Sequence, residues 1–162
     1  MIIGNKETFA IEYSIVQGNE YAFIELCYWA NNQMIGELEQ RNLLSAIVPL
    51  VDHILVYQGK RAFNTNPLKS TSDKDILEYL IENTWDNEDK HSKLYQTLNI
   101  LDIHSNESET FSGFFIFFIE EETYDRLLCK DVVYNQIIDC KLPKNVFYAC
   151  FETFKQVIHQ TI

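Results

Sequence analysis

The sequence predicts an α+β fold: a single domain with a mostly antiparallel sheet, helices packed on it and a closing C-terminal helix. Two observations predict it. Apolar and polar residues alternate in the first forty residues, and apolar residues recur at helical spacing in the middle and at the end of the chain. The 162 residues are 46% hydrophobic and 14% aromatic, which suffices for a core, so we expect residues 1–162 to form one domain.

The first elements predicted are three strands. Residues 9–16 alternate with the period of a half-buried strand, and Gly18-Asn19 ends the run. A second strand is expected over residues 21–29, followed by Asn31-Asn32, a pair that tolerates the positive φ of a tight hairpin. Residues 34–36 then return as a short third strand.

The middle of the chain is predicted to be helical. Apolar residues recur at helical spacing over residues 43–55, and Pro49 either kinks this helix or lies in the first turn of a new one. Residues 59–70 are typical of a loop. Ser72 is the expected N-cap of a helix that ends near Trp85. Another loop over residues 86–92 precedes a short helical turn around Leu94 and Tyr95.

The second half returns to strands and ends in a helix. A strand is expected over residues 98–104 and a polar turn over residues 106–110. Residues 111–119 are apolar at nearly every position, which predicts a central strand covered on both faces. Residues 124–130 and 136–142 predict two more strands. The closing helix starts at Pro143, and Phe147, Phe151 and Phe154 lie on its apolar stripe, so we expect them in the core.

No motif for catalysis or for a cofactor is present. The chain contains neither a phosphate-binding glycine loop nor a metal-binding histidine pair, so we expect no catalytic residue, no metal and no cofactor. The four cysteines lie in apolar stretches without C-x-x-C spacing and are expected to be buried and reduced. The competing class is a small enzyme built on a carboxylate pair, or on Cys140 beside Asp139 with His104 or His159.

The overall charge restricts the partners. With 13 basic and 24 acidic side chains the net charge is −11, which repels a phosphate backbone and attracts a basic protein. Solubility alone also explains an acidic composition. Residues 1–10 contain no apolar signal-peptide core, and long uncharged runs such as 42–51 and 110–119 are too short to span a membrane. We therefore expect a cytoplasmic protein that binds neither membranes nor nucleic acid directly.

Acidic side chains gather in two segments. Residues 73–89 contain seven acids and one base, Lys74, whereas residues 94–125 contain seven acids and neither Lys nor Arg. Such clusters are typical of a surface that binds a basic partner, and equally of an ordinary solvated surface. A third interpretation, a metal site made of paired carboxylates, has less support because the sequence contains no calcium-loop motif. The candidate partner-binding residues are Asp73, Asp75, Glu78, Glu82, Asp86, Glu88, Asp89, Glu107, Glu109, Glu120, Glu121 and Glu122.

Several short segments follow one another in a characteristic order. They are Ile3-Gly4-Asn5, Phe9-Ala10-Ile11-Glu12, Leu26-Cys27-Tyr28-Trp29, Ile35-Gly36-Glu37, Ser112-Gly113-Phe114, Phe117-Phe118-Ile119-Glu120, Arg126-Leu127-Leu128 and residues 151–158. Together these segments resemble a bacterial family, immunity protein 42. Residues 59–108 carry no matched segment. Proteins of this family accompany polymorphic toxins, including those of contact-dependent growth inhibition.

The resemblance implies a function in protein binding. It implies a cytosolic, non-enzymatic protein that binds a cognate toxin domain stoichiometrically, covering its active site or a neighbouring surface. Such toxins are often nucleases with basic clefts, in which an acidic face takes the place of the phosphate backbone. A monomer or weak dimer is expected. The remaining alternative is a generic acidic interaction module of a larger assembly.

Overall fold

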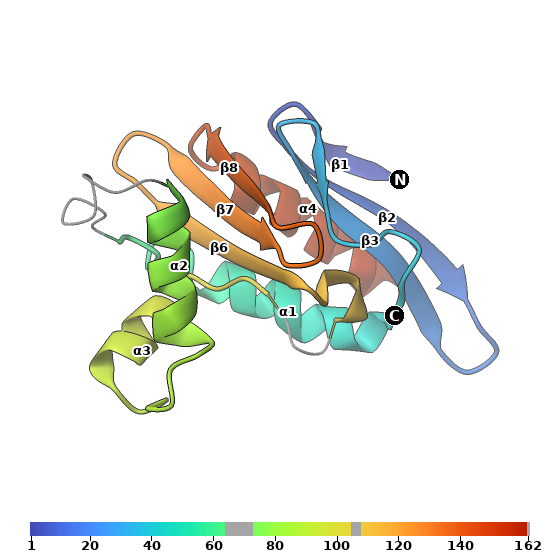
Figure 1. The fold of residues 1–162 in the computed structure, drawn as a ribbon. Helices are drawn as coiled ribbons and strands as arrows, with labels where there is room; N and C mark the ends of the chain where they lie inside the picture. The colour runs from blue at the N-terminus through green and yellow to red at the C-terminus, as the bar shows by residue number, and fades with distance from the viewer. Residues whose placement is uncertain (64–72, 105–107, 162) are drawn as a thin grey trace.

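The computed structural model describes residues 1–63, 73–104 and 108–161, and over these residues it is an α+β fold. Eight strands form two antiparallel sheets, and four α-helices and one 3-10 turn pack around them within the described part (Figure 1). The predicted fold class is therefore confirmed. The strands divide into two sheets, however, whereas the sequence predicted one.

The N-terminal strands form a five-stranded sheet. β1 (Ile2–Gly4), β2 (Phe9–Gln17), β3 (Ala22–Ala30) and β4 (Gln33–Ile35) pair in chain order. The tight hairpin between β3 and β4 is confirmed, because Asn31 and Asn32 have φ values of 50° and 61°. β5 (Arg41–Leu43) also pairs with β3, a strand that the sequence did not predict. Its Asn42 side chain is buried and donates to Thr110 Oγ1 at 2.6 Å, a contact that no local pattern encodes.

α1 (Leu44–Val56) is one continuous helix that contains Pro49. The alternative of a new helix beginning at Pro49 is therefore wrong. Proline removes the hydrogen bond to the carbonyl four residues earlier, which is that of Ser45. Ser45 and Pro49 are both exposed, so the missing hydrogen bond lies on the outer side of α1.

The C-terminal strands form a three-stranded sheet. β6 (Phe114–Glu120), β7 (Asp125–Asp131) and β8 (Gln136–Leu142) pair in that order. β7 is thus the central strand, and the prediction of a central strand over residues 111–119 is wrong in position. Residues 109–111 form instead a 3-10 turn, η2 (Glu109–Phe111).

The sequence of β6 has the apolar pattern of a central strand because both faces of β6 are covered. The edge of β6 that faces away from β7 is covered as well. The backbone of Phe118 donates to Leu101 O at 2.8 Å, and that of Ile103 donates to Ile116 O at 3.0 Å. The strand predicted over residues 98–104 reduces to this single β-bridge, between Asp102 and Phe117. The prediction fails because α3 (Lys93–Asn99) takes up the first two of its residues.

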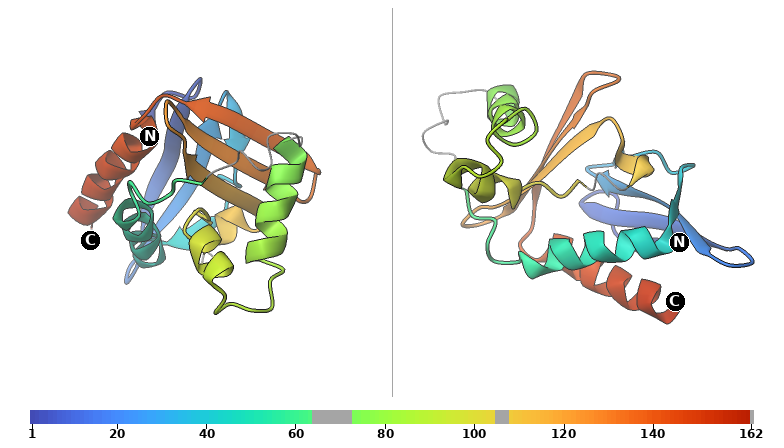
Figure 2. Two further views of the ribbon diagram at one scale, coloured as in Figure 1. Left: turned by 90° about the vertical axis from the view of Figure 1, so that its left-hand side faces the viewer. Right: turned by 90° about the horizontal axis from the view of Figure 1, so that it is seen from below.

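Helices cover both faces of the three-stranded sheet (Figure 2). α2 (Asp73–Thr84) and α3 pack on one face, and α1 and α4 (Val146–Thr161) lie on the other, against the five-stranded sheet. α4 begins three residues after the predicted Pro143. The prediction for its stripe is confirmed, since Phe147, Phe151 and Phe154 are fully buried.

The expected start of α2 at Ser72 and the loop after residue 63 lie outside the described residues. The loop over residues 86–92 and the helix that includes Leu94 and Tyr95 are confirmed. All four cysteines are buried and free of disulfides, as predicted. Among the described residues, no helix has the length and apolar content needed to cross a membrane.

Candidate functional site

The first acidic segment lies on α2 and on the loop that follows it. Four apolar residues hold α2 on the three-stranded sheet: Ile76, Leu77, Leu80 and Ile81. The exposed side chains of Asp75 and Glu82 lie elsewhere on the helix, and Glu78 is half-buried. The exposed acids Asp86, Glu88 and Asp89 follow in the loop, so the fold keeps this predicted cluster together at one end of the molecule. Asp73 begins α2.

Side-chain bonds give the loop after α2 a defined shape. Asn87 Oδ1 accepts the backbone N–H of Asp89 at 2.8 Å, and Asp89 Oδ1 accepts that of His91 at 3.1 Å. Lys90 Nζ donates to the carbonyls of Thr84 and Trp85 at the C-terminal end of the helix. A cation there complements the helix dipole. The acids of this loop are therefore presented from an ordered segment.

The second acidic segment does not form one surface. Glu107 lies outside the described residues, and Glu109 is exposed on η2. Glu120 ends β6, and Glu121 and Glu122 follow in the turn between β6 and β7, with Glu122 exposed. Glu109 and the three acids at 120–122, which lie in one acidic segment of the sequence, are thus found at opposite ends of β6.

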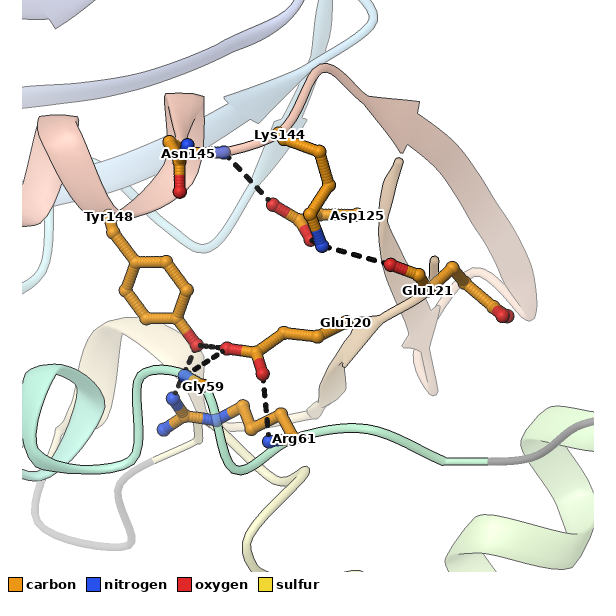
Figure 3. Close-up of polar contacts among 8 residues, drawn as sticks. All are labelled: Gly59, Arg61, Glu120, Glu121, Asp125, Lys144, Asn145 and Tyr148. Carbon is orange, nitrogen blue, oxygen red and sulfur yellow. Dashed lines mark hydrogen bonds and ion pairs between the residues drawn. The ribbon is translucent and has the colours of Figure 1, made fainter. Parts of the chain in front are cut away.

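The Glu120 carboxylate is bonded to the chain itself (Figure 3). Its oxygens accept the backbone N–H groups of Gly59 at 2.7 Å and Arg61 at 3.1 Å, and the hydroxyl of Tyr148 at 2.5 Å. These contacts join the segment after α1 to the end of β6 and to α4. Glu120 therefore acts as an internal tie between three elements.

Arg61 is a buried cation that sequence reasoning missed. Its side chain is fully buried, and its guanidinium donates to Ile54 O at 2.7 Å, Ile100 O at 2.9 Å and Tyr148 Oη at 2.9 Å. Carbonyl and hydroxyl oxygens thus satisfy a charge that would otherwise be costly to bury. No local signal marks this residue, because it lies in a polar segment that predicted a loop.

A second polar contact lies beside the first (Figure 3). Asp125 is 1% exposed and pairs with Lys144 at 2.5 Å, while its other oxygen accepts the backbone N–H of Asn145 at 3.2 Å. Lys144 also donates to the Glu121 carbonyl at 2.9 Å. A cavity of about 210 Å³ borders both contacts.

The Tyr148 hydroxyl and the two carboxylates of this region are engaged with one another and with the backbone. Burial, and the carboxylate of Glu120, raise the pKa of Tyr148, which keeps its hydroxyl protonated. The carboxylates of Glu120 and Asp125 accept hydrogen bonds from backbone N–H groups of Arg61 and Asn145, so both tie separate segments of the chain together.

Three groups of the enzyme hypothesis, Cys140, Asp139 and His104, each contact other partners, and His159 is exposed on α4. The Cys140 thiol lies 3.9 Å from the Thr8 carbonyl, and burial raises its pKa. Asp139 forms a two-pronged pair with Arg126, both distances being 2.8 Å, and His104 Nε2 donates to Phe111 O at 2.9 Å. Within the described ranges, no group of three or more His, Cys, Asp or Glu could hold a metal ion.

One further polar group lies beneath the C-terminal end of α2. Asp102 is buried and accepts the backbone N–H of His104 at 2.8 Å, and burial raises its pKa to about 7. Burial likewise lowers the pKa of His104. The Trp85 and His104 rings meet edge to face at 5.0 Å. A cavity of about 350 Å³ opens beside them, between η2 and the start of β6.

The two antiparallel sheets and their helices form an α+β fold that has a counterpart among solved structures. Among solved structures, the fold is similar to the crystal structure of CdiI from Burkholderia dolosa AUO158, with a TM-score of 0.67. The two chains are 16% identical, and the match covers 95% of this chain and 97% of the other. A search of curated proteins finds no match.

The family is shown by sequence. The model of the immunity protein 42 family matches residues 1–157, so the chain belongs to this family. The match includes residues 59–108, a range that contains none of the short segments resembling the family. It therefore places the polar ties and the acidic α2 within the family domain.

Proposed function

We propose that this protein neutralises a cognate toxin domain by binding it, and so protects the bacterium that produces the toxin. The observation that carries this proposal is the match of an immunity-protein family over nearly the whole chain. The absence of an assembled nucleophile or metal group among the described residues supports inhibition by stoichiometric binding rather than by catalysis.

The charge of the molecule supports a basic toxin, and among these a nuclease. A nuclease cleft attracts a phosphate backbone with lysine and arginine side chains. The acids on and after α2 present negative charge from ordered backbone, as a bound nucleic acid would. Glu82, Asp86 and Glu88 are the exposed members of this surface that we propose to face the toxin.

The decisive experiment measures how many copies of this protein are needed to inhibit one copy of the toxin. The chain is co-expressed and co-purified with the toxin encoded immediately upstream, and toxin activity is measured as the amount of this protein increases. We expect a stable complex and inhibition that is complete at one copy per toxin. Inhibition by a small fraction of one equivalent would instead indicate an enzyme that modifies the toxin.

Two controls complete this test. A non-cognate toxin should remain active, because an immunity protein recognises its partner specifically, whereas a generic acidic module would bind several basic proteins weakly. A nucleic-acid substrate should compete with this protein for the toxin if the acidic surface occupies a nuclease cleft. A cognate toxin that neither binds nor loses activity would contradict the proposal.

A further inference from the structure

The turn between β7 and β8 exposes three consecutive apolar side chains. Val132, Val133 and Tyr134 are 50%, 72% and 81% exposed, and Tyr134 is the most exposed large apolar side chain in the described ranges. Folding does not require apolar residues here, because polar ones would satisfy an exposed turn equally well. Seen from below in the right-hand view of Figure 2, this orange hairpin stands out from the rest of the molecule.

The turn is held rigidly in place. Asp131 Oδ1 accepts the backbone N–H groups of Val133 at 2.8 Å and of Tyr134 at 3.0 Å. The backbone of Val132 donates to Gly113 O at 2.8 Å, which ties the turn to the residue before β6. Anchor residues on an ordered turn lose little conformational entropy on binding, so the apolar contacts they make translate efficiently into affinity.

A cavity lies directly beside the turn. Val132 lines the cavity of about 350 Å³ together with Trp85, His104, Phe114 and Phe115. Its volume is sufficient to receive one large side chain of a partner. Exposed aromatic side chains and hollows lined partly by aromatic rings are features at which interface energy concentrates.

The charges around this surface select a basic partner. Glu109 lines the cavity, Asp86 follows Trp85 in the chain and Asp131 precedes Val132, whereas the described lining residues include no Lys or Arg. Lys130, opposite Phe115 in the strand register, is the cation on this part of β7. Three carboxylates outnumber the two cations, Lys130 and the Lys90 ammonium that binds the Trp85 carbonyl, and this acidic excess complements a positively charged surface.

We propose that the β7–β8 turn and the adjacent Trp85 cavity form the apolar centre of the toxin-binding interface. This proposal rests on the proposed function and adds its anchor: Val133 and Tyr134 pack against the toxin, and a toxin side chain enters the cavity. The occupant is a basic toxin domain, and the acids after α2 lie at the rim of the interface rather than at its centre.

Two truncations and two matched controls test the anchor. Tyr134→Ala and Val133→Ser remove exposed side chains, so the fold should be unaffected. Tyr21→Ala, at the 63% exposed turn between β2 and β3, and Val56→Ser, at a side chain 60% exposed on α1, are the controls. The probe is the toxin domain encoded upstream, with affinity measured by titration calorimetry and folding checked by thermal unfolding.

We expect Tyr134→Ala and Val133→Ser each to weaken toxin binding at least ten-fold, mainly through faster dissociation, and both controls to stay within two-fold of wild type. Ser112→Phe, which fills the mouth of the cavity from an exposed lining position, should also weaken binding.

Each contrary result has a distinct meaning. If the wild type binds the toxin and both turn variants bind it within two-fold of the wild-type affinity, the turn is not the anchor of the interface. The proposed function would then still hold. Equal losses in the variants and their controls would also overturn it, because the effect would not be local. A wild-type protein that does not bind the toxin would overturn the proposed function itself.

Discussion

At the scale of single residues, burial changes what a side chain does. Asp102 and Glu120 are both acids in the segment without Lys or Arg, yet Asp102 is buried beneath α2 and Glu120 ties three elements together. Asp102 has a backbone N–H donor at 2.8 Å but has left water, and burial dominates, so its pKa rises from 3.8 to about 7. Its ionisation therefore opposes folding near neutral pH.

The pH dependence of stability tests this assignment. Because the pKa of Asp102 is raised in the folded state, the native protein binds the proton more tightly than the unfolded chain between pH 4 and 7. The free energy of unfolding should therefore fall with rising pH across this window. Above the window, titration of this group causes no further change. We expect Asp102→Asn, relative to wild type, to gain about 4 kcal/mol from pH 4 to pH 7.5.

The variant is itself the control for other titrating groups. His104 has a lowered pKa and contributes the opposite slope, but it is present in both proteins. Urea unfolding at four pH values measures that difference. A wild-type-to-variant difference that stays constant with pH would show that Asp102 is ionised normally in the native protein.

At the scale of elements, α4 joins the two sheets. Phe151 contacts Phe9 of β2 and Tyr28 of β3, with ring centroids 6.0 and 5.5 Å apart, while Phe147 stacks on Phe118 of β6 at 3.9 Å. One apolar stripe on one helix therefore closes the core shared by both sheets. Its aromatic spacing reflects packing, not a ligand site.

Truncation of this stripe should be costly. We expect Phe151→Ala to lower the free energy of unfolding by about 3–5 kcal/mol, because it leaves a cavity where a fully buried ring was packed. Glu152→Ala, one residue further on the exposed face, should change it by less than about 0.5 kcal/mol. Denaturant unfolding measures both. Near wild-type stability of Phe151→Ala would show that the helix is not a core element.

At the scale of the whole molecule, the net charge of −11 is unevenly distributed. Exposed acids gather on and after α2, beside the cavity at Trp85, whereas ion pairs such as Lys6–Glu12 and Arg41–Glu25 balance the acids of the five-stranded sheet. A basic partner would be drawn toward the α2 end before any contact forms. The charge thus favours fast association, and the apolar turn favours slow dissociation.

Charge reversal separates these roles. We expect Glu82→Lys, Asp86→Lys and Glu88→Lys combined to slow toxin association several-fold at low salt. The matched control reverses Glu7, Glu20 and Glu152, which are exposed and lie outside α2 and its loop, so the net charge changes equally. Stopped-flow measurements should show the difference shrinking at 0.5 M salt, where the Debye length is only a few Å. Equal rates for both triple variants would assign the effect to net charge alone.

The sequence by itself determined the kind of most of the main elements. The alternation in residues 9–16, the Asn31-Asn32 turn and the aromatic stripe of α4 are local patterns, and each is found in the structure as predicted. The resemblance carried by short segments led to the family, which the match over residues 1–157 shows. These features could be predicted because periodicity and turn chemistry depend on neighbours along the chain.

The tertiary structure alone decided position and partners. It placed β6 at the edge of its sheet, paired β5 with β3, buried Arg61 and engaged Glu120 internally. It also set the Val132–Tyr134 turn beside the Trp85 cavity. Each of these depends on contacts between residues far apart in sequence, and burial, pKa and surface shape follow from such contacts rather than from local composition.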